Sequence, residues 1–319
     1  MITTQARHIS LTHTGPDKLT RAQIAEEIKQ IQQRLSKQFE SDPEKRNDLL
    51  KMLDELADFE LGRFFIKNKG ALSAYWTWYA ILGFNNSATT SPLERFILEK
   101  APIALATQER FSIFQTLLTK HIQSNSVVCS VPCGMMADLL TLNLPEQIKE
   151  VRFIGIDIDN TVFSLAKDLA KQMQSRFHCE FFKKDAWNLN MENTFDIITT
   201  HGLNIYEKDD SRIVALYRGL HNALKAHGKL ICSALTPPPI INNESEWDFS
   251  KISQADLISS SLLFKTILEA TWSNFHTSEK TCSQLKEAGF EDIEIHWDSR
   301  KMFPTFCAQK PALPNLTPR

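Results

Sequence analysis

Residues 127–140 read VVCSVPCGMMADLL, and this stretch decides the fold class. Its apolar run breaks at Pro132, Cys133 and Gly134 and then resumes with a helix-like pattern. A strand, a tight turn and a helix in this order are typical of the first unit of an open parallel sheet, which binds ligands at the carboxyl ends of its strands. If the chain binds a ligand, we therefore expect it at residues 132–134.

The downstream sequence repeats the same alternation. Two helical stripes, over residues 162–173 and 213–224, lie between short apolar runs. This alternation predicts a parallel sheet covered by helices on both faces. The last two runs are joined by a short link at Asp298 to Lys301, which is too short for a parallel crossover and predicts an antiparallel pair. The expected strands are residues 127–131, 153–157, 180–182, 195–200, 229–235, 291–297 and 302–309.

Residues 1 to about 120 have helical patterns and no strand pattern. Apolar residues within 24–35 recur at steps of four, three and four. Asp42 and Ser91 each precede a proline as helix N-caps, and Glu94 completes a capping box. We therefore expect an all-helical N-terminal region followed by a second domain at 121–319.

Four aromatic residues gather in this helical region, namely Tyr75, Trp76, Trp78 and Tyr79. They are either core contacts of a helical layer or the lining of a lid over a ligand pocket. A reaction site benefits from a cover that excludes water. We expect residues 1–120 to form such a cover, with Tyr75 and Trp76 facing the bound substrate.

The composition is that of an ordinary globular protein. The chain has 319 residues, 42% of them hydrophobic, which is enough for one large domain or two ordinary ones. A net charge of -2 gives no field that attracts nucleic acid or an anionic membrane, and we expect neither partner. No apolar run has the roughly 18 to 20 residues of a membrane span, and MITTQARHISLTHTG lacks a signal-peptide core. We therefore expect a cytoplasmic protein, and the sequence leaves its oligomeric state open.

The six cysteines include no C-x-x-C pair, so we expect free thiols. Cys129, Cys133, His178 and Cys179 are the alternative metal ligands. Several of them lie in predicted buried strands, where cysteine more often packs as a small apolar side chain. We therefore expect no metal.

Five segments together carry a resemblance to a known family. In order, VCSVPCGMMADLL, FIGIDID, FFKKDAWNL, FDIITTHGLNIY and LKEAGF resemble the class I S-adenosylmethionine-dependent methyltransferases over about residues 121 to 310. The helical first part resembles the N-terminal extension of a bacterial small-molecule branch. The resemblance implies a doubly wound, seven-stranded, mostly parallel Rossmann-like sheet, with S-adenosylmethionine as cofactor and S-adenosylhomocysteine as product. It also implies in-line methyl transfer to a small-molecule acceptor, a step that needs no nucleophilic side chain.

The first turn departs from the family pattern D/E-x-G-x-G-x-G. Ser130, Pro132 and Met136 differ from it, and Gly134 is the one glycine retained. One glycine still lets the backbone approach a ligand closely at one point. By resemblance, the cofactor-binding residues of this unit are Val131, Pro132, Cys133, Gly134 and Asp138.

Asp157 closes the second strand, 23 residues after Gly134. It resembles the acid that accepts hydrogen bonds from both ribose hydroxyls, which suits an acceptor-only carboxylate. The alternative role, a helix N-cap, belongs more naturally to Asp159.

The adenine site follows from the next two strands. Ile158 resembles the residue against one face of adenine, and Asp185 and the Ala186 amide resemble the groups that meet its polar edge, with Trp187 beside them. An Asp in such a strand-to-helix loop is also a common cap, and this reading of Asp185 stays open.

Arg110 in ATQERF precedes the first strand. Thr107 is able to cap its helix and Arg110 to be a solvated surface charge. Alternatively, Arg110 or Gln108 binds the methionine carboxylate of the cofactor, which a guanidinium fork fits.

The fourth strand ends in THGLNIY and lacks the [DNS]-P-P-[FYW] motif of amino-group and nucleobase methyltransferases, which argues against DNA adenine as substrate. His201, Asn204 and Tyr206 remain as residues that orient an acceptor or take its proton. The alternative is that the backbone of His201 lines the bottom of the cofactor-binding site.

Two other functions stay open. A dinucleotide-dependent oxidoreductase uses a similar sheet, but its G-x-G-x-x-G fingerprint is absent from a turn with one glycine. A cofactor-binding protein that has lost catalysis and acts through partners is the third hypothesis, and it is suggested by the altered turn.

Overall fold

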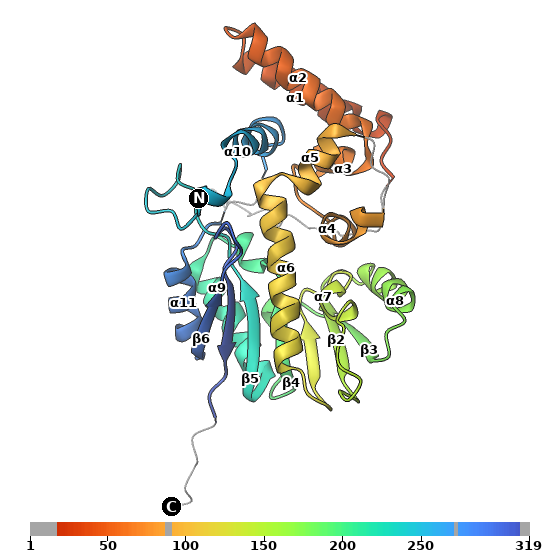
Figure 1. Ribbon diagram of the computed structural model, residues 1–319, viewed down its shortest axis with the longest axis vertical. Coiled ribbons are helices and arrows are strands. Elements are labelled where there is room, and N and C mark those ends of the chain that lie inside the picture. Colours follow the sequence, from red (N-terminus) through yellow and green to blue (C-terminus); the bar gives the residue numbers. More distant parts are fainter. Residues whose placement is uncertain (1–17, 87–90, 271–273, 313–319) are drawn as a thin grey trace, which may run out of the picture.

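The computed structural model describes residues 18–86, 91–270 and 274–312 (Figure 1). The expected absence of a signal peptide concerns residues 1–17, which lie outside the described residues. The strands are β1 (Val127–Ser130), β2 (Arg152–Asp157), β3 (His178–Lys183), β4 (Phe195–Thr200), β5 (Leu224–Ser233), β6 (Glu291–His296) and β7 (Thr305–Gln309).

All of these strands form one sheet in the order β3-β2-β1-β4-β5-β7-β6. Strand β1 pairs in parallel with both β2 and β4, whereas β7 is antiparallel to β5 and β6. The predicted parallel sheet and the predicted antiparallel C-terminal pair are both confirmed. The strand order reverses between β1 and β4, so the crevice for a ligand lies at the carboxyl ends of these two strands.

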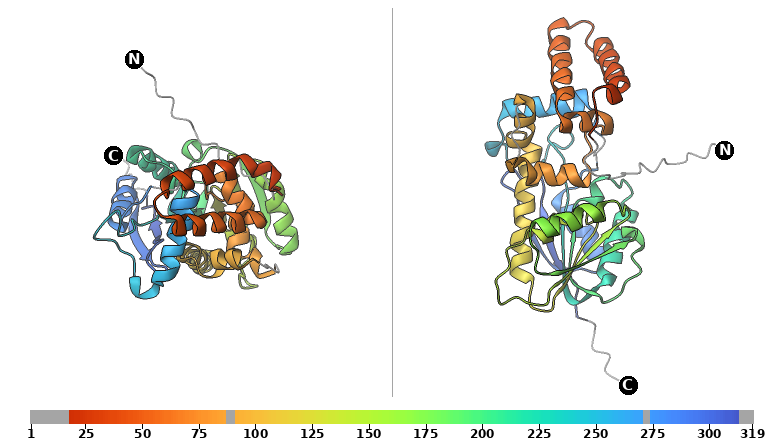
Figure 2. Two further views of the ribbon diagram at one scale, coloured as in Figure 1. Left: turned by 90° about the horizontal axis from the view of Figure 1, so that it is seen from above. Right: turned by 90° about the vertical axis from the view of Figure 1, so that its right-hand side faces the viewer.

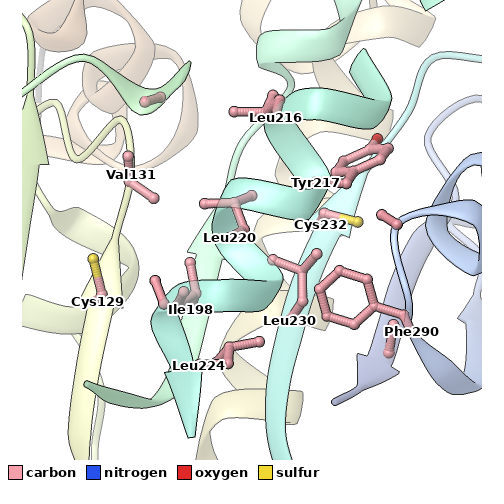
Figure 3. Close-up of a cluster of buried hydrophobic side chains, with 14 of the residues drawn as sticks. Cys129, Val131, Ile198, Leu216, Tyr217, Leu220, Leu224, Leu230, Cys232 and Phe290 are labelled. Carbon is pink, nitrogen blue, oxygen red and sulfur yellow. The ribbon is translucent and has the colours of Figure 1, made fainter. Parts of the chain in front are cut away.

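Helices cover both faces of the sheet. On one face lie α9 (Asp210–Ala223) and α11 (Ser278–Glu287), and on the other lie α6 (Pro102–His121), α7 (Ala137–Leu140) and α8 (Val162–Gln172). Figure 3 shows the first of these two cores, in which Leu220 and Tyr217 of α9 lie over Ile198 and Leu230 of the sheet. Because the helices pack onto both faces, the strands are buried and apolar on each side.

The remaining helices form a separate layer beyond the carboxyl edge of the sheet (Figures 1 and 2). They include α1 (Ala25–Gln38), α2 (Pro43–Asp58), α3 (Glu60–Asn68), α4 (Ala74–Ile81) and α5 (Pro92–Glu99), with 3-10 turns η1 (Ala22–Ile24) and η2 (Gly83–Asn86). Further 3-10 turns are η3 (Ala186–Asn188), η4 (Leu203–Ile205) and η5 (Phe249–Lys251).

A second segment of the chain joins this layer. Helix α10 (Gln254–Ser261) runs into the π-helical η6 (Leu262–Ile267), and Leu263 and Phe264 are buried among the side chains of α1 to α5. The Arg34 guanidinium of α1 donates to the carbonyls of Thr266 and Ile267, at 2.8 and 2.6 Å. We call α1 to α5 together with α10 and η6 the helical cap.

Two predicted helix starts are confirmed and one is wrong. Asp42 accepts a hydrogen bond from the Lys45 amide at 3.1 Å, and Ser91 from the Glu94 amide at 3.2 Å. Helix α6 instead begins at Pro102, so Thr107 lies inside it and its hydroxyl donates to the Ile103 carbonyl. A proline at the first helical position is a stronger start than a threonine five residues later.

Candidate functional site

The turn after β1 is held by β2 and by the cap. Gly134 has a φ of 48°, in the left-handed region, and its amide donates to Asp157 Oδ2 at 3.0 Å. A Cβ atom at Gly134 would lie 3.2 Å from the Cβ of Ala74 in α4. Glycine therefore serves both the backbone conformation and the close approach of α4.

The Asp157 carboxylate lies at the carboxyl end of β2 and is 3% exposed. Besides the Gly134 amide, it accepts from the Asp159 amide at 3.0 Å. A carboxylate has about four lone-pair sites and only accepts, which suits the binding of ligand hydroxyls. Asp159 itself accepts from the Thr161 amide and hydroxyl, at 2.9 and 2.7 Å, and so makes the local turn before α8.

The expected adenine residues surround the ends of β2 and β3. Ile158 is 62% exposed, which is unusual for an isoleucine at a strand end. Asp185 accepts from the Trp187 amide at 3.0 Å and therefore caps η3, while Ala186 beside it is buried. The Trp187 indole donates to the Arg212 carbonyl at 3.0 Å, which holds its ring against α9. The contact of Asp185 with adenine remains a prediction.

A hydrogen-bond network joins the ends of β1 and β4 through Asp138, which is 3% exposed. Its carboxylate accepts from Ser130 Oγ at 3.0 Å and Thr199 Oγ1 at 2.6 Å, and His201 Nε2 lies 3.1 Å from it. Burial alone would raise the pKa of Asp138, but the hydrogen bonds from His201, Thr199 and Ser130 and the attraction of His201 lower it overall. Asp138 is enclosed by these three partners, and its contact with the cofactor remains a prediction.

The network fixes the orientation of His201. The imidazole ring is stacked on Phe114 of α6, with ring centroids 4.1 Å apart. Because an ionised Asp138 can only accept, Nε2 of His201 carries the proton that it donates, and in the neutral ring Nδ1 is the acceptor. In that neutral tautomer, Nδ1 of His201 is the atom able to accept a proton.

Val131 and Cys133, both expected to bind the cofactor at the first turn, have buried side chains. The Val131 side chain is 1% exposed within the core, and its amide donates to the Thr199 carbonyl at 2.9 Å. Contact of Val131 with the cofactor remains a prediction. Cys133 is also buried, and this burial raises the pKa of its thiol. Pro132 is only partly buried at the same turn.

All six cysteines are free. Within the described ranges no cluster of three or more His, Cys, Asp or Glu side chains has the arrangement of a metal site. None of the helices in these ranges is long and apolar enough to cross a membrane.

The aromatic residues of α4 divide into two groups. Trp76 is 2% exposed and lies inside the core of the cap, with its ring 5.2 Å from Tyr79 and 6.0 Å from Phe64. The indole is thus packed among apolar side chains of the cap, and its contact with the acceptor remains a prediction. Tyr75 is partly buried and contacts both the cap core and the core around α6 to α8, so it lies where the two layers meet.

Asn204 and Tyr206, both predicted to act on the acceptor, differ in their exposure to solvent. Asn204 is 5% exposed, and its carbonyl accepts from Asn274 Nδ2 at 2.9 Å. Tyr206 is 47% exposed. Contact of either side chain with an acceptor remains a prediction.

Arg110 is not a surface charge. It is 7% exposed, its Nη1 donates to Ser233 Oγ at 3.4 Å, and its guanidinium lies 4.7 Å from the centre of the Phe303 ring. Gln108, the other residue considered for the methionine carboxylate, donates to the carbonyls of Ala80 and Leu98, both at 2.9 Å. Gln108 therefore ties α4 and α5 to α6, and the guanidinium of Arg110 is the one directed toward the ends of β4 and β5.

Sequence reasoning missed Ser130, Thr199, Phe114 and Ser233. Ser130 was considered only as a departure from the glycine pattern. No local signal distinguishes a strand-end serine or threonine that holds a carboxylate from one that does not, so their roles follow from the fold alone.

A methyltransferase-domain family matches residues 129–228. A protein from Bordetella parapertussis, described as a possible exported protein, is 37% identical, with 91% of this chain and 96% of that one covered and a TM-score of 0.85. The magnesium protoporphyrin IX methyltransferase of Synechocystis, solved with S-adenosylhomocysteine, is 13% identical, with 73% of this chain and 96% of that one covered and a TM-score of 0.47. No curated protein matches the sequence significantly.

The matched domain spans β1 to β5, where the turn, Asp157 and the Asp138 network lie. The methyltransferase-domain match thus covers the part of the chain that holds the β1 turn and the acidic residues after it. The residues at the carboxyl ends of β1 and β2 fit S-adenosylmethionine, because a left-handed glycine, the Asp157 carboxylate and the exposed Ile158 lie together there.

Proposed function

We propose that the protein is an S-adenosylmethionine-dependent methyltransferase that acts on a small-molecule acceptor held between the helical cap and the carboxyl edge of the sheet. In this proposal the sheet and the helices that cover its faces bind the cofactor, and the helical cap is the lid. The boundary expected at residue 120 shifts, because α6 packs on the sheet and η6 packs in the cap. The observation that carries it is the contact of α4 with the β1 turn, where a Cβ at Gly134 would lie 3.2 Å from the Ala74 Cβ, closer than an ordinary contact. A site covered this closely suits a small acceptor better than a nucleic acid, and the net charge of -2 agrees.

Asp157 binds the ribose hydroxyls in this proposal, and Ile158 and the Ala186 amide contact the adenine, with Asp185 at its polar edge. When bound, the cofactor would supply a methyl group on a sulfonium for in-line transfer to the acceptor, with S-adenosylhomocysteine as the leaving group. The protein contributes by positioning the acceptor, for which effective molarity supplies up to roughly 7 to 11 kcal/mol.

His201 takes the proton of the acceptor at Nδ1, while Asp138 holds its ring and stabilises the positive charge that results. Tyr206 and Tyr75 face the acceptor from opposite layers. The support is that Asp138 lies 3.1 Å from Nε2 and that Phe114 fixes the plane of the ring. The helical cap excludes water while this transfer takes place.

We also propose a cytoplasmic location. Its support is that all six cysteines are free, four of them buried, which suits a reducing compartment. Recovery of the native protein in the soluble fraction of spheroplasts supports this location, and recovery in the medium or the periplasm contradicts it.

Titration calorimetry with S-adenosylhomocysteine tests the core of the proposal, with NAD as the matched control. Micromolar binding, about -8 kcal/mol, is expected for S-adenosylhomocysteine and none for NAD. Absence of heat and of thermal stabilisation with millimolar S-adenosylhomocysteine would remove the cofactor assignment. Binding of cofactor without release of S-adenosylhomocysteine from any tested acceptor would favour a protein that has lost catalysis.

A further inference from the structure

A buried arginine at the junction of the cap and the sheet is left without a charged partner. Arg110 is 7% exposed, yet no ion pair among residues 18–86, 91–270 and 274–312 includes it, and its Nε has no hydrogen-bond acceptor there. Its one hydrogen bond, to Ser233 Oγ, is long at 3.4 Å. A guanidinium offers five N–H donors, so most of its capacity is unused.

One buried acid, Asp298, attracts this charge without forming an ion pair with it. Asp298 is 2% exposed, and its carboxylate accepts from the amides of Arg300 and Phe303, at 3.0 and 2.6 Å. Burial lowers the pKa of Arg110 to about 10, against the weaker opposing influence of Tyr206 and Asp298. The side chain is therefore still charged at neutral pH, and a buried charge without a partner destabilises a protein.

The guanidinium lies apart from the residues assigned to the cofactor. Those residues follow β2 and β3, whereas Arg110 Nη1 is bonded to Ser233, at the end of β5, and comes within 3.8 Å of where a Cβ of Gly202, just after β4, would be. In the sheet order, β5 and β2 are separated by β4 and β1. Arg110 is thus on the side of the crevice that the cofactor residues leave free.

Besides Ser233, Tyr206 and Asp298, the guanidinium has an apolar side. Its carbon lies over the Phe303 ring, 4.7 Å from the ring centre, and Phe303 belongs to a buried cluster that joins α6, the loop after β4, the segment after β5 and the segment before β7. The other members of that cluster are Ala106, Ile205, Leu235, Ile252 and Met302. A site with one cation and apolar walls suits an apolar molecule with a single carboxylate better than a phosphate, which is more strongly hydrated.

We propose that Arg110 binds the carboxylate of the methyl acceptor and that the acceptor is an apolar carboxylic acid, whose methyl-accepting group is a second group that gives its proton to His201. This rests on the proposed function and names its substrate class. It also reassigns Arg110 from the methionine carboxylate of the cofactor to the second substrate.

Benzoate is the probe for this site, and benzamide, which has the same shape without the charge, is the control. Binding of each is measured by calorimetry and thermal shift, with and without saturating S-adenosylhomocysteine. Benzoate is expected to bind at least about tenfold more tightly than benzamide, because only benzoate forms charge-assisted bonds. Equal binding of the two, or no binding of benzoate, overturns the proposal.

Arg110→Met separates ligand binding from a structural role. Methionine fills a similar volume without charge, so the variant is expected to lose the benzoate preference while its Tm stays equal or rises. The affinity for S-adenosylhomocysteine is expected to change by less than about threefold, because the proposal gives Arg110 no contact with the cofactor. A tenfold loss of affinity would correspond to about 1.4 kcal/mol of lost contact. Arg176→Met is the matched control, because that guanidinium donates to the carbonyls of Leu144 and Pro145, far from the carboxyl edge.

Other results contradict the proposal in distinct ways. A marked fall in Tm for Arg110→Met, with Arg110→Lys restoring it, would mean that the charge is structural. A loss of S-adenosylhomocysteine affinity beyond about tenfold would return Arg110 to the cofactor. If the wild-type protein binds no S-adenosylhomocysteine, the proposed function fails, while benzoate binding without cofactor still decides whether Arg110 forms an anion site.

Discussion

The carboxyl edge of the sheet and the helical cap hold their buried polar groups in different ways. At the edge, Asp157 and Asp138 each accept hydrogen bonds from several donors fixed by the sheet. In the cap, the Trp76 indole nitrogen is buried and has no acceptor among the described residues. The edge is therefore preorganised by hydrogen bonds, whereas the cap is stabilised at α4 by apolar contact. This difference predicts that cap substitutions change stability and that edge substitutions change binding as well.

Trp76→Ala is expected to have the largest effect. Removing an indole that is 2% exposed creates a cavity in the cap core and should lower the free energy of unfolding by about 3 to 5 kcal/mol. Chemical denaturation measures this loss. Tyr75→Phe, which removes only a hydroxyl from the neighbouring ring, is the control and should cost less than about 1 kcal/mol. A cost below about 1 kcal/mol for Trp76→Ala would place the indole outside the core and favour its predicted contact with the acceptor.

Asp157→Ala is the matching substitution at the edge. Loss of charge-assisted bonds should weaken S-adenosylhomocysteine binding by about 1.5 to 3 kcal/mol, or roughly 10- to 150-fold. The sequence suggests that the fold is unaffected, but the carboxylate also holds the Gly134 and Asp159 amides, so a lower Tm is expected too. Calorimetry and thermal unfolding report the two effects separately. Asp168→Ala is the control, since Asp168 is exposed and pairs only with Lys171 on the surface of α8. Unchanged affinity in Asp157→Ala would contradict its ribose role.

Gly134→Ala probes the contact between the two regions and has the smallest expected effect. A left-handed alanine costs about 1 to 2 kcal/mol, and its Cβ would also press on Ala74. Gly219→Ala in α9 is the control, since its Cβ would meet no atom within 4 Å and should stabilise the helix by about 0.4 to 1 kcal/mol. Denaturation curves of both variants give the difference. Equal stability of the two would mean that α4 does not press on the turn.

The sequence predicted the sheet region in most of its detail. Strand β4 was expected at 195–200 and is found there, and the antiparallel pairing of β6 with β7 followed from the shortness of their link. These features depend on local periodicity and connection length, which a single sequence displays directly. The position of Asp157 at the end of β2 was predictable for the same reason.

The cap and the charged groups of the site were less predictable. From the sequence, the aromatic residues of α4 could pack in a core or line a lid. In the structure Trp76 is buried in the core of the cap, whereas Tyr75 lies where the cap meets the sheet domain. Arginine side chains are mostly exposed to solvent, so the sequence alone favoured a surface position for Arg110. Its burial depends on where α6 lies against β5 and β7, which periodicity within α6 does not specify.

The sequence by itself determined the class of sheet, the strand ends that carry the acidic residues, the single-glycine turn and the helical nature of the N-terminal region. Only the tertiary structure decided which side chains meet. Thr199 reaches Asp138 across 61 residues, Arg110 reaches Ser233 across 123, and Arg34 binds η6 across 233. Contacts over such separations result from the packing of whole elements, so the local pattern around each residue does not record them.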